Sequence, residues 1–142
     1  MEKIMISIDG TQNFGNNDTN NVELTTAGEL EVLEDSYTLK YEESELTGME
    51  GTTTTVSFEL TRPELVVMSR TGSVNGTLCF EDGERIMCSQ NTPEMELPLV
   101  IDTERMENTL TEDGGELKIS YGMEFRGSIV QRSLMHIEVR PV

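Results

Sequence analysis

Arg70 is the residue in this sequence that is most clearly placed to bind a ligand or a charged partner, because its charge falls on a face where apolar side chains are expected. Val66, Met68 and Arg70 are spaced two apart, and such residues share one face of a β-strand. A guanidinium buried on that face needs a partner. Two roles stay open. Arg70 binds the carboxylate or phosphate of a ligand, or it has a structural role, paired with an internal acid such as Glu43 or reaching water at the rim.

Acidic residues gather at Glu42-Glu43-Ser44-Glu45. Carboxylates suit a hard cation, but the Asp-x-Asp-x-Asp-Gly spacing of a calcium loop is missing. A solvated acidic turn is therefore the plainer interpretation. Glu42 and Glu43 are neighbours on an expected strand and point to opposite faces, which argues against a glycosidase-like pair of carboxylates.

The single histidine and the two cysteines offer little chemistry. His136 is expected to point outward, between the inward Met135 and Ile137, which argues against a catalytic triad or a multi-histidine metal site. Cys79 and Cys88 are expected to be free thiols that pack as small apolar residues. The glycines do not form a dinucleotide or P-loop motif. The sequence thus predicts no catalytic residue, no metal site and no cofactor.

The elements that must position these residues are short segments of period-two alternation. The clearest run over residues 4–8, 37–41, 66–70, 117–125 and 135–139, and Gly, Asn, Asp or Pro separates most segments. This pattern is typical of all-β folds, and 17 threonines agree with it. We count about ten strands and no strong helix. A meander without a domain linker predicts one domain over residues 1–142, a closed antiparallel up-and-down barrel of about 8–10 strands.

Turn residues give further local predictions. Ala27-Gly28 is expected to turn between two short strands, and the polar residues 13–21 are expected to form a loop. Asp82-Gly83 is expected to close a hairpin. Leu60 should face inward at the end of a strand that Pro63 closes, because proline lacks a ladder donor.

Charge and composition exclude some partners. The chain has 27 acidic against 10 basic residues, a net charge of -17, so phosphate backbones and anionic membranes would repel it. Leu, Ile, Val and Phe make up about a quarter of its 142 residues, enough for a modest core. The apolar run at residues 65–68 is far too short to span a bilayer, and the first residues lack a signal-peptide pattern. We expect a soluble cytoplasmic protein that binds neither nucleic acid nor membrane.

Several motifs together resemble the YwiB-like family of small bacterial β-barrel proteins. They are YEESELTGMEGTTTT at residues 41–55, RTGSVN at 70–75, FEDG at 80–83 and GGELKISY at 114–121. The resemblance extends over residues 3–140 and implies a calycin-like or lipocalin-like closed barrel. It implies no activity, because the family is a domain of unknown function. The chain departs from the family pattern after Thr92-Pro93, where Glu94-Met95 replace an aromatic residue and a glycine.

Two functions follow as hypotheses. In the first, the barrel binds a small apolar or anionic ligand; the expected lining residues are Arg70, Tyr41, Glu43, Phe58, Phe80 and Tyr121. In the second, the barrel is filled by side chains and serves as a structural or interaction module, for example a homodimer. An exposed apolar patch would favour this alternative, with Met5, Leu33 and Val100 as candidates. An enzyme is the least favoured class, because no catalytic constellation is visible.

Overall fold

The structure, a computed structural model, describes residues 2–13 and 19–142. Ten antiparallel strands close into a barrel in the order β1-β10-β9-β8-β7-β6-β5-β4-β3-β2, which confirms the predicted fold class and fits a calycin-like architecture. The elements are β1 (Glu2–Asn13), β2 (Thr19–Val32), β3 (Ser36–Glu42), the short 3-10 helix η1 (Glu45–Thr47), β4 (Thr52–Glu59), β5 (Arg62–Gly72), β6 (Asn75–Glu81), β7 (Arg85–Thr92), β8 (Met95–Asn108), β9 (Gly115–Phe125) and β10 (Ser128–Pro141).

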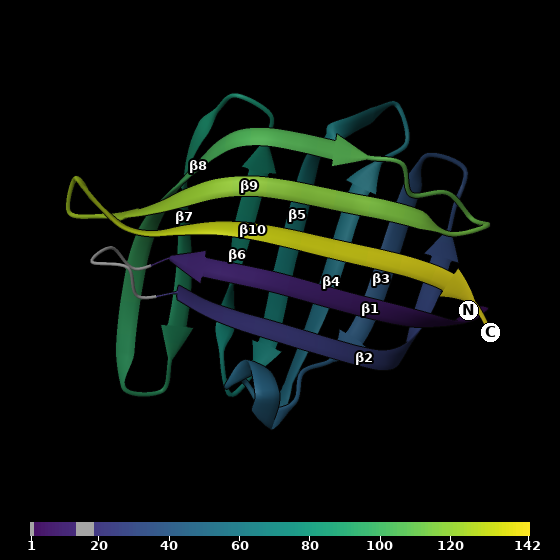
Figure 1. The fold of residues 1–142 in the computed structure, drawn as a ribbon, viewed down its shortest axis with the longest axis horizontal. Coiled ribbons are helices and arrows are strands. Elements are labelled where there is room, and N and C mark those ends of the chain that lie inside the picture. The colour runs from purple at the N-terminus through teal and green to yellow at the C-terminus, as the bar shows by residue number, and fades with distance from the viewer. Residues whose placement is uncertain (1, 14–18) are drawn as a thin grey trace.

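The barrel is flattened into two layers. In Figure 1, β8, β9, β10, β1 and β2 lie in front, and their strands run across those of β3 to β7 behind them. The first and last strands pair with each other, from Ile4 opposite Pro141 to Asn13 opposite Arg132. This pairing closes the barrel and leaves no open sheet edge between β1 and β10. Of the polar loop predicted at 13–21, residues 14–18 lie outside the described residues, and the prediction is wrong for the rest, because Asn13 belongs to β1 and residues 19–21 belong to β2.

The interior follows the predicted alternation. Inward side chains from every strand meet in one core, whose largest fully buried members are Tyr37, Phe80, Ile4, Ile6, Leu30, Leu39, Met68, Ile101, Leu117, Ile119, Ile137 and Val56. The hairpin turn predicted at Asp82-Gly83 is confirmed. Among the described residues, the structure contains no helix with the length and apolar character that a membrane span needs.

The predicted hairpin turn at Ala27-Gly28 is wrong. Strand β2 runs unbroken through both residues, and Gly28 lies opposite Ile4 on β1. A Cβ atom on Gly28 would lie 2.8 Å from the backbone oxygen of Lys40 and 2.3 Å from Cδ1 of Ile6. The glycine therefore serves a close approach of strands β2 and β3 rather than a turn.

The end of β4 also differs from the prediction. The strand ends at Glu59, and Leu60 lies in the following turn with 40% of its surface exposed, not in the core. Pro63 does not close this strand but is the second residue of β5. The start of a strand is a position where a missing ladder donor is tolerated.

The pairing of β2 with β3 is short. It covers four residue pairs, from Glu29 opposite Lys40 to Val32 opposite Tyr37. The first part of β2 instead follows β1, while the end of β3 leads into η1. Beyond the paired residues, η1 lies beside β2.

Candidate functional site

A cavity of about 350 Å³ lies where β2 and β3 separate. This volume is at the lower end of the range found for small-molecule sites. Its lining comes from β1, β2, β3, η1 and the turn after it, β5, β9 and β10, and consists of Ile8, Gly10, Gln12, Asn20, Val22, Tyr41, Glu43, Glu45, Leu46, Thr47, Gly48, Met49, Arg70, Tyr121, Ser133, Leu134 and Met135.

The η1 turn forms one wall of this cavity. Ser44 caps it, because its Oγ accepts a hydrogen bond from the backbone N–H of Leu46. Gly48 ends the turn with a φ of 74° and donates its N–H to the oxygen of Glu45, a left-handed conformation that glycine adopts without strain. This geometry places Leu46 and Met49 at the cavity. The acidic connection between β3 and β4 is therefore an ordered turn that lines one side of the cavity.

A row of inward polar residues crosses five strands at this end. Cross-strand pairing aligns Tyr41 with Thr54, Thr54 with Arg70, Arg70 with Gly76, and Gly76 with Gln90. Nη1 of Arg70 donates a 2.7 Å hydrogen bond to Oε1 of Gln90. The hydrogen bond therefore reaches across β6, where Gly76 has no side chain and its Cα packs close to the backbone of Ser89 and Gln90.

Arg70 also pairs with the buried Glu43. The Nε atom of Arg70 lies 3.7 Å from Oε2 of Glu43, whose side chain is 2% exposed. Thr54 donates a 2.5 Å hydrogen bond from its hydroxyl to the same carboxylate oxygen. The buried Nε of Arg70 has no hydrogen-bond partner in the described part of the chain. Arg70 therefore has Glu43 as the internal acidic partner expected for a structural role, and it also lines the cavity.

Two tyrosines complete the polar part of the lining. Burial, followed by the charge of Glu43, raises the pKa of Tyr41, whose side chain also interacts with Thr54. Burial raises the pKa of Tyr121 as well, against a smaller lowering by its hydrogen bond with Ser133. Ser133 accepts a 2.6 Å hydrogen bond from Nε2 of Gln131. Both hydroxyls stay neutral at pH 7 and can donate or accept hydrogen bonds.

Four of the six residues predicted to line the site border this cavity: Arg70, Tyr41, Glu43 and Tyr121. The other two lie elsewhere. Phe58 stacks on Tyr37 with ring centroids 4.8 Å apart. Phe80 is fully buried and packs edge-on against Tyr121 at 4.9 Å, so it supports the lining from behind.

Comparison with known proteins identifies the family. A family model described as a domain of unknown function, DUF1934, matches residues 6–137. The chain belongs to the DUF1934 family. Its fold is similar to the crystal structure of the ywiB protein from Bacillus subtilis, with a TM-score of 0.85 and 20% sequence identity over 99% of this chain and 92% of that one. The predicted YwiB-like resemblance is confirmed. No curated protein matches.

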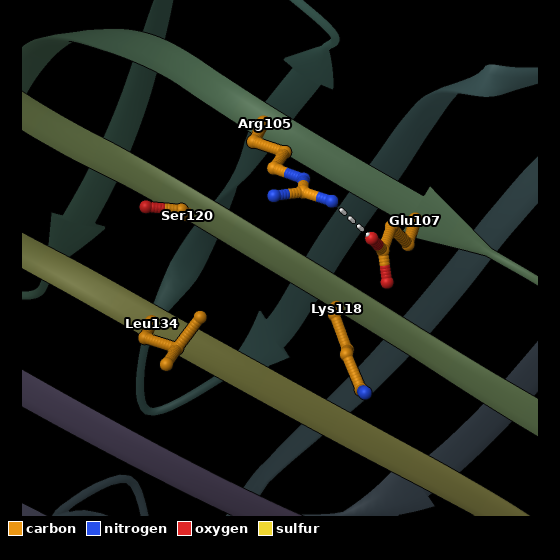
Figure 2. Close-up of a pocket in the computed structure, with 5 residues that line it drawn as sticks. All are labelled: Arg105, Glu107, Lys118, Ser120 and Leu134. Atoms are coloured by element: carbon orange, nitrogen blue, oxygen red, sulfur yellow. Dashed lines mark hydrogen bonds and ion pairs between the residues drawn. The ribbon is translucent and has the colours of Figure 1, made fainter.

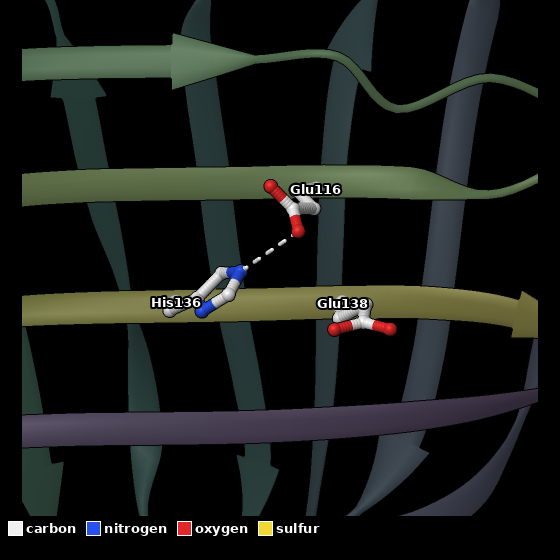
Figure 3. Close-up of side chains that lie close together, drawn as sticks. All are labelled: Glu116, His136 and Glu138. Carbon is white, nitrogen blue, oxygen red and sulfur yellow. Dashed lines mark ion pairs between the residues drawn. The ribbon is translucent and has the colours of Figure 1, made fainter.

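This DUF1934 protein also has a metal-type cluster on its outer face. Figure 3 shows His136 and Glu138 on β10 beside Glu116 on β9, with the imidazole directed at Glu116. One donor atom from each residue lies within 4.8 Å of the others, and Nε2 of His136 is 3.6 Å from Oε1 of Glu116. Each carboxylate already has a cationic neighbour. Nζ of Lys118 lies 3.6 Å from Oε2 of Glu116, and Nε of Arg140 lies 3.8 Å from Oε1 of Glu138. His136 points outward, as predicted.

The outer face of this DUF1934 protein also has a hollow, separate from the cavity, with a volume of about 220 Å³. Figure 2 shows its lining on β8, β9 and β10, with Arg105 directed at Glu107. That pair spans 2.6 Å, but both side chains are exposed, and exposed ion pairs contribute little energy. Unlike the cavity, this hollow has no buried charged side chain in its lining.

The two cysteines of this DUF1934 protein are free, as predicted. Cys88 is buried, and its Sγ accepts a hydrogen bond from the backbone N–H of Cys79 at 3.2 Å. Cys79 is half-buried. Burial raises the pKa of the Cys88 thiol, which disfavours the nucleophilic thiolate.

Proposed function

We propose that this DUF1934 protein is a binding protein that holds one small ligand in the cavity between β2 and η1, rather than an enzyme. The observation that carries the proposal is a cavity of about 350 Å³ whose lining combines apolar side chains with Arg70, Tyr41 and Tyr121. Sites for small molecules combine an apolar lining with a few placed polar groups. Barrels of this size can hold one small ligand.

Native mass spectrometry of protein purified gently from its source tests the proposal. A stoichiometric extra mass that disappears on denaturation is the expected result. Ser133→Met narrows the cavity and removes a lining hydroxyl, and it should abolish the extra mass. Ser120→Met is the matched control, because it makes the same substitution in the outer hollow. A bare polypeptide mass for the native protein would contradict the proposal.

The alternative is a structural or interaction module. One observation favours it: Arg70 already has Glu43 and Gln90 as partners inside the protein, as expected for a structural charge pair. Of the residues predicted to form an apolar patch, Leu33 is exposed, while Met5 and Val100 are half-buried. The same native spectrum reports whether the protein is a homodimer. The cytoplasmic location and the absence of nucleic-acid and membrane partners stay predictions from the charge and the sequence.

A further inference from the structure

We infer that the cavity takes an uncharged ligand with a carbonyl acceptor oxygen and a short apolar chain, such as an amide, ester or ketone, in preference to a carboxylate. The inference rests on the proposed function and narrows it, since the sequence left both an apolar and an anionic ligand open. Three observations support it: the charge balance of the lining, the exposure of the ion pair, and the apolar wall.

The first observation is the charge balance. Among the described residues that line the cavity, the charged ones are Arg70, Glu43 and Glu45. Arg70 and Glu43 compensate each other, with Nε of Arg70 3.7 Å from Oε2 of Glu43, so the buried part of the lining is neutral, while Glu45 is exposed to water. A ligand carboxylate at Arg70 would place a second anion beside Glu43 where little water screens the repulsion. The lining therefore disfavours an anionic ligand.

The second observation is which half of the ion pair the ligand meets. The side chain of Arg70 is 13% exposed, whereas that of Glu43 is 2% exposed. The guanidinium carries five N–H donors and no acceptor, and among the described residues it makes one hydrogen bond, to Gln90. At the ion pair a ligand therefore meets the N–H donors of Arg70, while the carboxylate of Glu43 is nearly covered. A neutral carbonyl oxygen can accept from Arg70 without adding a charge to the site.

The third observation is the apolar wall. Ile8 and Val22 face the cavity from β1 and β2, Leu46 and Met49 from η1 and the turn after it, and Met135 from β10. Burial of a ligand's methylene groups against these side chains supplies affinity that a polar group alone does not. Flexible methionines also adapt to ligands of different shape. The wall suits a short alkyl chain attached to the carbonyl group.

The test compares two probes that share one chain, octanamide and octanoate, by NMR titration at pH 7. The wild-type protein is expected to bind octanamide about 10-fold more tightly, a difference of about 1.4 kcal/mol. Equal or tighter binding of octanoate would overturn the inference while leaving the proposed function intact. If neither probe binds at millimolar concentration and the native spectrum shows a bare polypeptide, both the inference and the proposed function fail.

A pair of variants tests the cause of the preference. Glu43→Gln keeps the side-chain size and removes the buried charge, so octanoate should gain about 10-fold relative to octanamide. Glu42→Gln is the matched control: Glu42 is exposed and accepts a hydrogen bond from Thr53 on the outer face, so the preference should not change. An unchanged preference in a folded Glu43→Gln variant would overturn the inference. If that variant does not fold, the wild-type comparison decides alone.

Discussion

The two ends of the barrel interior contain similar residues in different surroundings. Strand β3 places one inward tyrosine near each end, Tyr37 and Tyr41. We call the end of the interior around Tyr37 and Phe58 the closed end, and the end around Tyr41 the cavity end. At the closed end, Tyr37 is fully buried, stacks on Phe58, and has a hydroxyl without a hydrogen-bond partner among the described residues. At the cavity end, Tyr41 interacts with Thr54 and Glu43 and borders open space.

The difference shows that the same barrel can have a packed interior at one end and a cavity at the other. The stacked rings of Tyr37 and Phe58 fill the closed end, where side chains are held by packing and the hydroxyl of Tyr37 has no partner among the described residues. At the cavity end, the row from Tyr41 to Gln90 fixes side chains by hydrogen bonds and an ion pair. Tyr41 and Arg70 of this row, together with Glu43, border the cavity.

The largest expected effect is at the cavity end. Arg70→Met leaves Glu43 buried without its cation, so the free energy of unfolding should fall by about 3–5 kcal/mol. Urea denaturation monitored by circular dichroism measures it. Arg62→Met is the control, because Arg62 pairs with Glu81 on the surface and such pairs contribute about 0–1 kcal/mol. Similar losses for the two variants would mean that Arg70–Glu43 behaves like a surface pair.

A smaller effect is expected where β2 leaves β3, between the two ends. Gly28→Ala places a Cβ atom against Lys40 and Ile6, and the crowding should cost about 1–3 kcal/mol. In Gly10→Ala the new Cβ meets no atom within 4 Å, so this variant should be neutral or slightly more stable. Thermal unfolding of both variants gives the comparison, and equal melting temperatures would contradict it.

The two tyrosines of β3 sharpen the contrast directly. Tyr41→Phe removes a hydroxyl that interacts with Thr54 and Glu43 and should cost about 1–2 kcal/mol. Tyr37→Phe removes a hydroxyl that lacks a partner, so stability should stay equal or rise slightly. Urea denaturation of the two variants distinguishes them. A larger loss for Tyr37→Phe would reverse the roles assigned to the two ends.

The smallest effect is the dependence of folding stability on tyrosine ionisation, because the tyrosines are neutral at pH 7 and the effect arises only in alkaline solution. Burial raises the pKa of Tyr37 from 10.0 to about 12 and raises the pKa values of Tyr41 and Tyr121 as well. Above pH 10 the unfolded chain releases these protons while the folded protein retains them, so stability falls as pH rises. Tyrosinate absorbance should therefore appear together with loss of circular dichroism. Ionisation of all three tyrosines in the folded protein near pH 10 would contradict this.

The sequence predicted what alternation controls. Period two placed Arg70, Tyr41 and Tyr121 inside and separated Glu42 from Glu43. It did not predict Gln90, because this partner depends on the register of β5, β6 and β7, which alternation within one strand does not determine. Ser133 was also missed, although it continues the inward alternation of Met135 and could have been found from it.

Phe58 shows why inward direction alone does not define a site. It points inward, as predicted, but packs at the closed end, because the distance of a residue from the cavity along the barrel depends on strand register and tilt. Gly28 shows a similar limit. A glycine can mark a turn or a close approach of two strands, and the long pairing of β1 with β2 decides between them.

The pairing of β1 with β10 also determines how the protein folds. Because Ile4 pairs with Pro141, the barrel is completed by contacts between segments far apart along the chain. Such contacts bring a high entropic cost of loop closure, and proteins dominated by them fold slowly, in milliseconds to seconds. During synthesis the barrel cannot close until β10 has left the ribosome, so the edge of β1 stays open to other strands throughout translation.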